Sequence, residues 1–152
     1  MPSSDYEARE EQLLRGRTPL WVERWRGETS TGMFVCYDAR TSLIVLDGKL
    51  EDACAEWLEP LMNKALSGTQ LLHFIDQGNL DSPNTKVRDL YIKLLKQRRA
   101  DLTRVHVFMG SNVFVRMITM AVNVLFVGLG EFHNDRAALD RALEIALGER
   151  SA

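Results

Sequence analysis

The 152-residue sequence lacks several features that would place it in a specialised class of protein. It has only two cysteines, Cys36 and Cys54, which make neither a disulfide framework nor a zinc site. Both lie in apolar patterns, so we expect buried free thiols in a reducing compartment. The net charge is -2, so the chain has no overall basic field of the kind that drives nucleic-acid binding, and we expect no nucleic-acid partner.

The sequence also lacks a long hydrophobic run. The segment at 113–130 comes nearest to a membrane span, but its uncharged run begins after Arg116 and lasts only fourteen residues. A helix needs about 20 apolar residues to cross a bilayer, so we predict a buried helix here and no membrane span. The first nineteen residues are polar and charged and do not resemble a signal peptide, which favours a cytoplasmic protein.

The composition that remains is typical of a globular protein, with 45% hydrophobic and 26% charged residues in a length that suits one domain. Residues 1–19 have few apolar anchors and end in a turn signal. We therefore predict that they form a flexible or weakly helical N-terminal arm. The remainder of the chain, 20–148, is predicted to be a single domain.

The spacing of apolar residues changes after about residue 48. Before that point, three strand-like runs joined by turn-like connections predict antiparallel strands at 21–25, 33–38 and 43–47. After it, strand-like runs at 71–76, 105–109 and about 131–132 alternate with amphipathic segments. Helices between strands imply right-handed crossovers and parallel pairing. We predict an α/β fold with a mixed β-sheet, antiparallel N-terminal strands, parallel β-α crossovers and about four helices.

The most informative segment is LLHFIDQGNLDSP, residues 71–83. It predicts a strand that stops on Asp76, a polar loop at 77–82, and a helix opened by Asp81-Ser82-Pro83, because Pro suits the first helical position and Ser can cap it. Open α/β sheets keep their sites at the carboxyl ends of strands, which makes this loop a candidate site. Ser82 has two interpretations, a helix cap or a phosphorylation site whose dianion the helix terminus would stabilise.

The order of elements and two short segments resemble the STAS domains, the family of the SpoIIAA-type anti-sigma factor antagonists. The segment 43–61 is similar to the family's strand followed by Gly-x-Leu and an amphipathic helix, with Gly48 and Leu50 at the matching places. The segment 72–82 is similar to the family's strand that ends in Asp, with a loop that closes on Asp-Ser. The resemblance covers roughly residues 20–147 and implies a STAS-like fold with a non-catalytic regulatory role in bacteria.

One departure from the family pattern concerns the phosphorylation site. The family's phospho-switch members have a small residue and a glycine after Asp-Ser, whereas this sequence has Pro83 and Asn84 there. The resemblance is therefore to divergent members of the family, and the departure favours the helix-cap interpretation of Ser82.

The helix predicted at 113–127 is apolar on two sides. We expect one stripe to face the sheet: Val113, Met117, Met120, Ala121 and Val124. The second stripe consists of Phe114, Ile118, Val122, Leu125 and Phe126. A surface helix needs only one buried stripe, so the second is expected to contact the last helix, the N-terminal arm, another subunit, a lipid-like ligand or a partner protein.

Residues with catalytic or metal-binding chemistry do not form a recognisable motif. His73 and His106 lie in strands expected to be neighbours, and we expect both to point away from the main helix-covered face as a structural pair, with metal binding or pH sensing as the alternative. His133 lies in a polar loop and carries little signal. The three acids that follow strands, Asp47, Asp76 and Asp81, have no regular ligand spacing. No spacing argues for nucleophilic catalysis, so we expect no metal, no cofactor and no enzyme activity.

We therefore predict a non-catalytic protein-interaction or regulatory domain in bacterial signalling, whose partner would be a regulator, a kinase or a GTPase-type protein. The binding surface is predicted to combine the 77–82 loop with the adjacent helices. The candidate partner-binding residues are Gln77, Asn79, Asp81, Ser82, Ser111, Asn112, Phe114, Ile118 and Val122. The alternative is a carrier or sensor of an apolar small molecule or lipid, and the second stripe would also allow a homo-oligomer.

Overall fold

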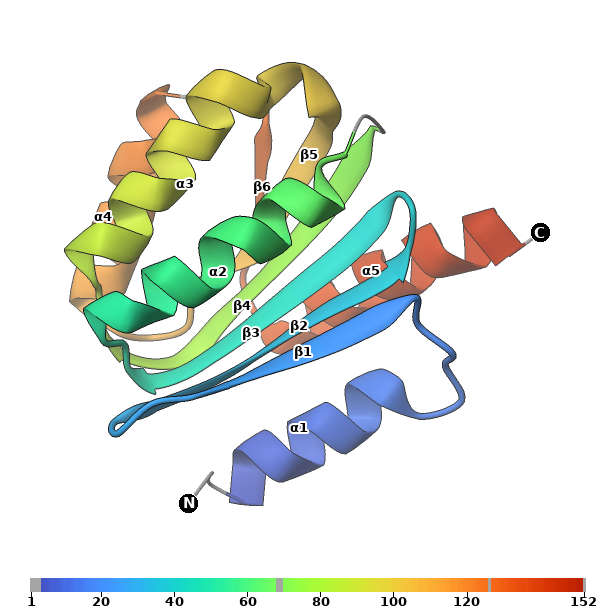
Figure 1. Ribbon diagram of the computed structural model, residues 1–152, viewed down its shortest axis with the longest axis horizontal. Coiled ribbons are helices and arrows are strands. Elements are labelled where there is room, and N and C mark those ends of the chain that lie inside the picture. Colours follow the sequence, from blue (N-terminus) through green and yellow to red (C-terminus); the bar gives the residue numbers. More distant parts are fainter. Residues whose placement is uncertain (1–3, 68–69, 126, 152) are drawn as a thin grey trace.

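A computed structural model of the chain describes residues 4–67, 70–125 and 127–151. Its centre is one six-stranded sheet whose strands follow each other in chain order (Figure 1). β1 (Trp21–Arg26), β2 (Ser30–Asp38) and β3 (Thr41–Lys49) pair antiparallel. β4 (Leu71–Ser82), β5 (Leu102–Phe108) and β6 (Gly130–His133) continue the sheet parallel to β3. The predicted mixed sheet, with its change from antiparallel to parallel pairing, is confirmed.

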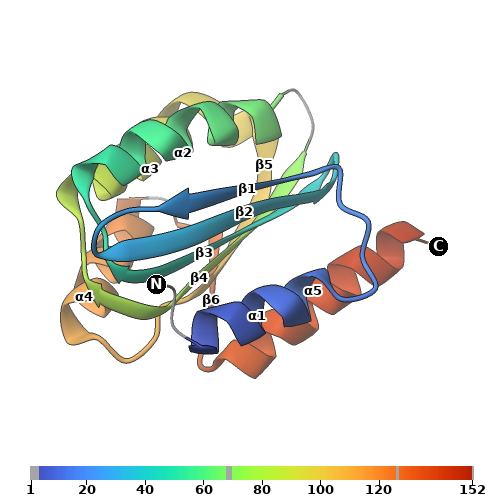
Figure 2. The ribbon, with the colours of Figure 1, turned by 60° about the horizontal axis from the view of Figure 1, so that its bottom comes forward.

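Helices cover both faces of the sheet (Figure 2). α2 (Asp52–Ala65), α3 (Thr85–Arg98) and α4 (Val113–Leu125) lie on one face, where each fills a crossover between parallel strands. α1 (Ser4–Leu14) and α5 (Arg136–Ser151) lie on the other face. The described residues thus contain five α-helices, close to the predicted number.

Each face of the sheet has its own apolar core. In β3, Ile44 and Leu46 pack under α2, whereas Leu43 and Val45 belong to the core beneath α1 and α5. Side chains of a strand alternate between faces, so a strand that is covered on both sides must be apolar at successive positions. This requirement explains the uninterrupted LIVL run at 43–46.

The N-terminal segment is more closely packed than the predicted arm. α1 places Tyr6, Arg9 and Leu13 on one side of the helix, and all three side chains are buried. The Tyr37 hydroxyl on β2 donates a hydrogen bond to the carbonyl of Leu13 at 3.0 Å. The sequence did not indicate this packing because a charged residue, Arg9, stands at the centre of the buried face, where a hydrophobic pattern needs an apolar one.

β4 is longer than the strand predicted at 71–76. It runs to Ser82, and its second half pairs with the end of β3 through two irregularities in register, so that Asn79 lies opposite Asp47 and Ser82 opposite Lys49. The predicted loop at 77–82 is therefore wrong. Irregularities of this kind let a strand with polar and glycine residues stay paired while it changes direction.

Candidate functional site

Asp76 is a structural residue on the α1 side of the sheet. Its buried carboxylate accepts hydrogen bonds from Arg9 Nε at 2.9 Å, Arg136 Nε at 2.9 Å and the backbone amide of Gly78 at 2.9 Å. Arg9 in turn makes two 2.7 Å bonds to the Asp140 carboxylate. The network joins α1 and α5 to the middle of β4, so Asp76 does not share a cation site with the exposed carboxylate of Asp81.

Ser82 does not cap the following helix. α3 begins at Thr85, and its N-cap is Asn84, whose Oδ1 accepts a hydrogen bond from the Val87 amide at 3.0 Å. The residue before a proline is restricted to extended conformations, so Ser82, which precedes Pro83, continues the strand. The predicted cap at Ser82 and first helical position at Pro83 are wrong. Phosphorylation of Ser82 remains a prediction, without the support of a helix terminus at that residue.

The next helix, α4, begins with a side-chain cap. Asn112 Oδ1 accepts a hydrogen bond from the Val115 amide at 3.0 Å, and Asn112 Nδ2 donates to the carbonyl of Asp81. Gly110 has a φ of 71°, and a side chain at this position would collide with the backbone of Gly78. This close approach positions the start of α4 directly beside the end of β4.

α4 presents the opposite face to the sheet from the one predicted. Val115 is buried, and Ile118, Thr119 and Val122 are half-buried beside it. The predicted inward stripe is exposed instead, together with Phe114 and Val127. The exposed fractions of its large side chains lie between 46% and 77%: Val113, Phe114, Met117, Met120, Val124 and Val127. We call these six residues the α4 stripe. Of the predicted second stripe, the Leu125 side chain and Phe126 lie outside the described residues.

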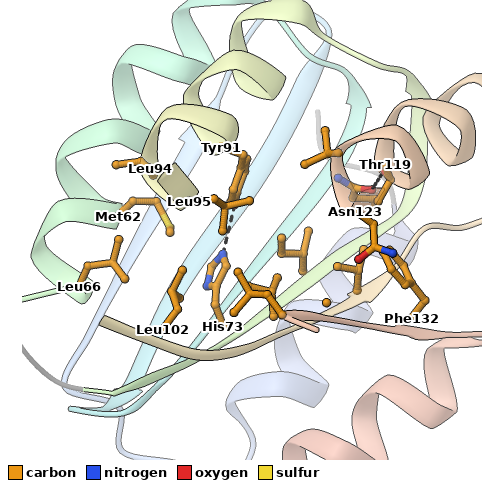
Figure 3. Close-up of a pocket in the computed structure, with 17 residues that line it drawn as sticks. Met62, Leu66, His73, Tyr91, Leu94, Leu95, Leu102, Thr119, Asn123 and Phe132 are labelled. Atoms are coloured by element: carbon orange, nitrogen blue, oxygen red, sulfur yellow. Dashed lines mark hydrogen bonds between the residues drawn. The ribbon is translucent and has the colours of Figure 1, made fainter. Parts of the chain in front are cut away.

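The inner face of α4 lines a cavity of about 80 Å³ between the sheet and the helices α2, α3 and α4 (Figure 3). Most of its wall is apolar, with Met62 and Leu66 from α2 and its end, Leu94 and Leu95 from α3, and Phe132 from β6. A second hollow of similar volume lies next to this cavity. The two share four wall residues: Gln77, Tyr91, Thr119 and Val122. α4 therefore covers its part of the sheet without filling the space beneath it.

A few polar groups interrupt the apolar wall. His73 Nε2 lies 3.2 Å from the Tyr91 hydroxyl (Figure 3). On the other side of the ring, His73 Nδ1 lies 2.8 Å from the Ser42 hydroxyl. Burial lowers the pKa of His73 to about 3, so the ring is neutral at pH 7. Burial, followed by the neighbouring Cys54, raises the pKa of Tyr91. The site thus offers neutral hydrogen-bonding groups and no charge. Ser42 is fully buried beneath them, which does not suit a nucleophile.

The predicted pairing of His73 with His106 is wrong. His73 faces the α3 side of the sheet, whereas the ring of His106 stacks on Phe74, which belongs to the core beneath α1 and α5. The error is one of register, because His106 lies opposite Phe74 and not opposite His73. In a parallel pair, residues that lie opposite each other share a face, and their sequence neighbours occupy the other face.

The nine predicted partner-binding residues divide into three groups. The first lies together at the start of α4 and the end of β4: Asp81, Ser82, Ser111, Asn112 and Phe114. The second lines the two hollows: Gln77, Ile118 and Val122. The remaining residue, Asn79, lies on the α1 side beside Arg9 and Arg136. Thr119, whose hydroxyl donates to Gln77 Oε1 at 3.1 Å, was missed by the sequence analysis. As a polar residue, it interrupts the apolar stripe to which it belongs.

Within the described part of the chain, no helix combines the length and the hydrophobicity that crossing a membrane requires. No protein-family model and no curated protein matches the sequence. The arrangement of strands and helices nevertheless matches solved structures and shows a SpoIIAA-like fold, which is the fold predicted from the sequence.

Two of these structures are informative. An uncharacterized protein of the DUF3478 family from Shewanella loihica PV-4, described as having a SpoIIAA-like fold, is 20% identical with a TM-score of 0.54; the match covers 81% of this chain and 92% of that one. The anti-sigma factor antagonist SpoIIAA in its unphosphorylated form is 14% identical with a TM-score of 0.55, covering 72% of this chain and 93% of that one. At these identities the likeness shows the fold.

Proposed function

We propose that the chain is a non-catalytic regulatory domain that binds a protein partner through the α4 stripe. The observation that carries the proposal is the exposure of six large apolar side chains, five on α4 and Val127 in the turn that follows it. Monomeric proteins rarely leave a contiguous apolar surface of this kind in water, and such surfaces mark binding sites. The SpoIIAA protein of similar fold is named for its action on another protein, an anti-sigma factor, which supports a protein as the partner.

The rim of this surface supports the same proposal. Asp81 and Ser111 are exposed beside the first turn of α4, and Asn112 joins them by its bond to the Asp81 carbonyl. An apolar centre with a polar, hydrogen-bonding rim is the usual anatomy of a protein interface. Ser82 lies at the same rim, where a phosphate would add a dianion and oppose a partner that fits the neutral surface.

The test compares two substitutions that each introduce a charge at an exposed apolar position. Met117→Glu lies in the α4 stripe, and Ile145→Glu lies on α5, on the other face of the molecule. We expect a protein cross-linked to the wild-type chain in its native cells to be recovered equally with Ile145→Glu and at least roughly tenfold less with Met117→Glu, the loss typical of a charge buried in an interface. Equal recovery with both variants would contradict the proposal.

The same pair of variants distinguishes a second copy of the chain from a different protein. If the α4 stripe joins two copies, the wild type and Ile145→Glu sediment as dimers and Met117→Glu as a monomer. A heterologous partner predicts monomers in all three cases, because the stripe then remains free in the purified protein.

A second candidate function is the binding of a small apolar molecule, which the cavity beneath α4 favours. An apolar wall with a neutral His73–Tyr91 pair suits a ligand with one hydroxyl or carbonyl group. The 80 Å³ has room for only a few water molecules, and the cavity is partly open to solvent, so a larger ligand would either extend out of it or move α4 outward.

Native mass spectrometry of the purified chain tests this second candidate, with Val122→Phe to fill the cavity and Val124→Phe, on the exposed side of the same helix, as the control. We expect a co-purified mass with the wild type and with Val124→Phe that Val122→Phe lacks. A bare chain mass in all three preparations would remove the support for a carrier.

A further inference from the structure

Three side chains with metal-ligating groups meet at the edge of the sheet, away from the cavity and the α4 stripe. His106 on β5 lies opposite Glu131 on β6, and His133 follows two residues later on the same strand. Alternation along a strand puts residues two apart on one face, so all three side chains share the face that carries α5. Among the described residues, they form the only group of three or more such side chains whose ligand atoms all lie within 4.8 Å of one another.

The distances fit a metal centre. His106 Nδ1 lies 2.9 Å from His133 Nε2 and 3.6 Å from Glu131 Oε2. Zinc bonds of about 2.0–2.1 Å at tetrahedral angles place neighbouring ligand atoms about 3.3 Å apart. The two observed separations lie on either side of that value, and the ligand atoms of Glu131 and His133 lie within 4.8 Å of each other. Rotation of the three side chains would bring their ligand atoms to the required spacing. We propose that His106, Glu131 and His133 bind one divalent transition-metal ion of the zinc class.

The ligand types determine which ions fit. Two imidazoles and one carboxylate suit zinc and its neighbours in the first transition series, whereas magnesium and calcium prefer sites made of oxygen ligands. Three protein ligands leave the fourth tetrahedral position open to water or to a group from another molecule. The site therefore resembles an open centre and not the closed four-ligand type.

The two histidine ligands are held in place before any ion arrives. The ring of His106 stacks on Phe74 with centroids 4.5 Å apart and planes 6° apart. The ring of His133 stacks on that of His106 with centroids 5.2 Å apart and planes 17° apart. All three residues lie in strands, which fix side-chain directions more firmly than loops. Two features oppose binding. The 2.9 Å contact between His106 Nδ1 and His133 Nε2 is a hydrogen bond, and its proton must leave before both nitrogens can bind the ion. Arg104 Nε lies 3.9 Å from Glu131 Oε2 and competes for the carboxylate.

Metal binding at this place would stabilise the edge of the sheet. β6 has four residues and, of the strands that the structure describes, pairs only with β5. An ion held by His106 on one strand and by Glu131 and His133 on the other joins the two strands directly. A ligand that binds only the folded chain adds its binding free energy to the stability, so zinc should raise the melting temperature.

The test is a titration of the full chain, without an affinity tag, with zinc chloride, followed by calorimetry and by the NMR signals of the histidine rings. We expect one equivalent to bind and to shift the signals of His106 and His133. His73, the third histidine of the chain, is buried on the other face of the sheet and should not respond. A tenfold excess of magnesium should not displace the zinc.

Variants separate this site from adventitious binding. His133→Gln and Glu131→Gln, both at the edge strand, should each weaken zinc binding roughly tenfold or more. Arg104→Gln should strengthen it about threefold to tenfold, because it removes the competing cation. Glu23→Gln on β1, at the opposite edge, is the matched control and should leave the affinity unchanged. The proposal is overturned if zinc leaves the His106 and His133 signals in place, or if both edge variants bind it as tightly as the wild type.

Discussion

Replacing Asp76 by alanine should strongly destabilise the protein and release α1 from the sheet. The substitution removes the acceptor of hydrogen bonds from Arg9, from Arg136 and from the Gly78 amide. The two arginines are affected differently. Water can reach Arg136, whose side chain is 32% exposed, whereas Arg9 is buried and, among the described residues, keeps only its bonds to Asp140 and Gln12.

The magnitude follows from what remains around Arg9. Removing one partner of a buried ion pair costs about 3–5 kcal/mol, because the other charge stays buried without compensation. Since Arg9 retains the bidentate Asp140, we expect the lower end of this range, about 3 kcal/mol. Removing Arg9 is milder. In Arg9→Leu the carboxylate of Asp76 keeps its hydrogen bonds from Arg136 and the Gly78 amide. We therefore expect the free energy of unfolding to fall by about 1–2 kcal/mol.

Urea unfolding of Asp76→Ala, Arg9→Leu and the double variant measures both values and their coupling. The double variant should lose less stability than the sum of the two single losses, by about 0.5–3 kcal/mol. Glu11→Ala, which removes the partner of Arg15 in an ion pair about 70% exposed on both sides, is the control and should cost at most about 0.5 kcal/mol. Trypsin should cleave within α1 faster in Asp76→Ala than in the control. A loss below about 1 kcal/mol, or strict additivity, would refute the reasoning.

Three further predictions concern the start of α3, the buried His73 and the cavity beneath α4. Asn84→Ala should lower the free energy of unfolding in urea by about 1 kcal/mol, because the Val87 amide loses its hydrogen-bond acceptor. Ser82→Ala should lower it by less than about 0.5 kcal/mol. The reverse order would indicate that Ser82 is the cap. The His73 ring should not titrate between pH 8 and 4.5 by NMR, because burial lowers its pKa to about 3. The folded-state pKa of His73 lies below its unfolded value of 6.5, so its contribution to stability is complete above pH 6.5. That contribution decreases, at roughly 1.4 kcal/mol per pH unit, as the pH falls towards 3. A titration midpoint of the His73 ring above about pH 5 would exclude this. Val122→Phe should raise the melting temperature, as cavity-filling substitutions commonly add about 0.5–2 kcal/mol, and Val124→Phe should not.

Much of the fold could be predicted because it depends on patterns that act locally. The apolar run at 43–46 and the regular spacing of apolar residues in α2 and α3 identify elements whose order allows few topologies. Pairing irregularities are different. The continuation of β4 to Ser82 depends on its pairing with the end of β3, which contributes no apolar signal to the sequence of residues 77–82.

The orientation of α4 was harder to predict because large apolar residues lie on both sides of this helix. On α4, the exposed side carries more large apolar residues than the inner side, which includes Thr119 and Asn123. A hydrophobic pattern assigns the more apolar side to the core, and here that rule gives the wrong orientation. The cluster of His106, Glu131 and His133 was not predicted for a related reason. Glu131 and His133 come close to His106 only through the pairing of β6 with β5.

The orientation of α4 links the two candidate functions. Its inner face lines the cavity, its outer face carries the α4 stripe, and its start is fixed by the hydrogen bond from Asn112 to Asp81 at the end of β4. A molecule in the cavity and a protein on the stripe would therefore contact opposite sides of one helix. If the cavity ligand moves α4 outward, it changes the surface that the protein binds, and thermodynamic linkage requires the protein to change the affinity of the ligand by the same factor. A carrier and a regulatory domain are thus compatible descriptions of this chain, because one helix that covers the sheet without filling the space beneath it would serve both.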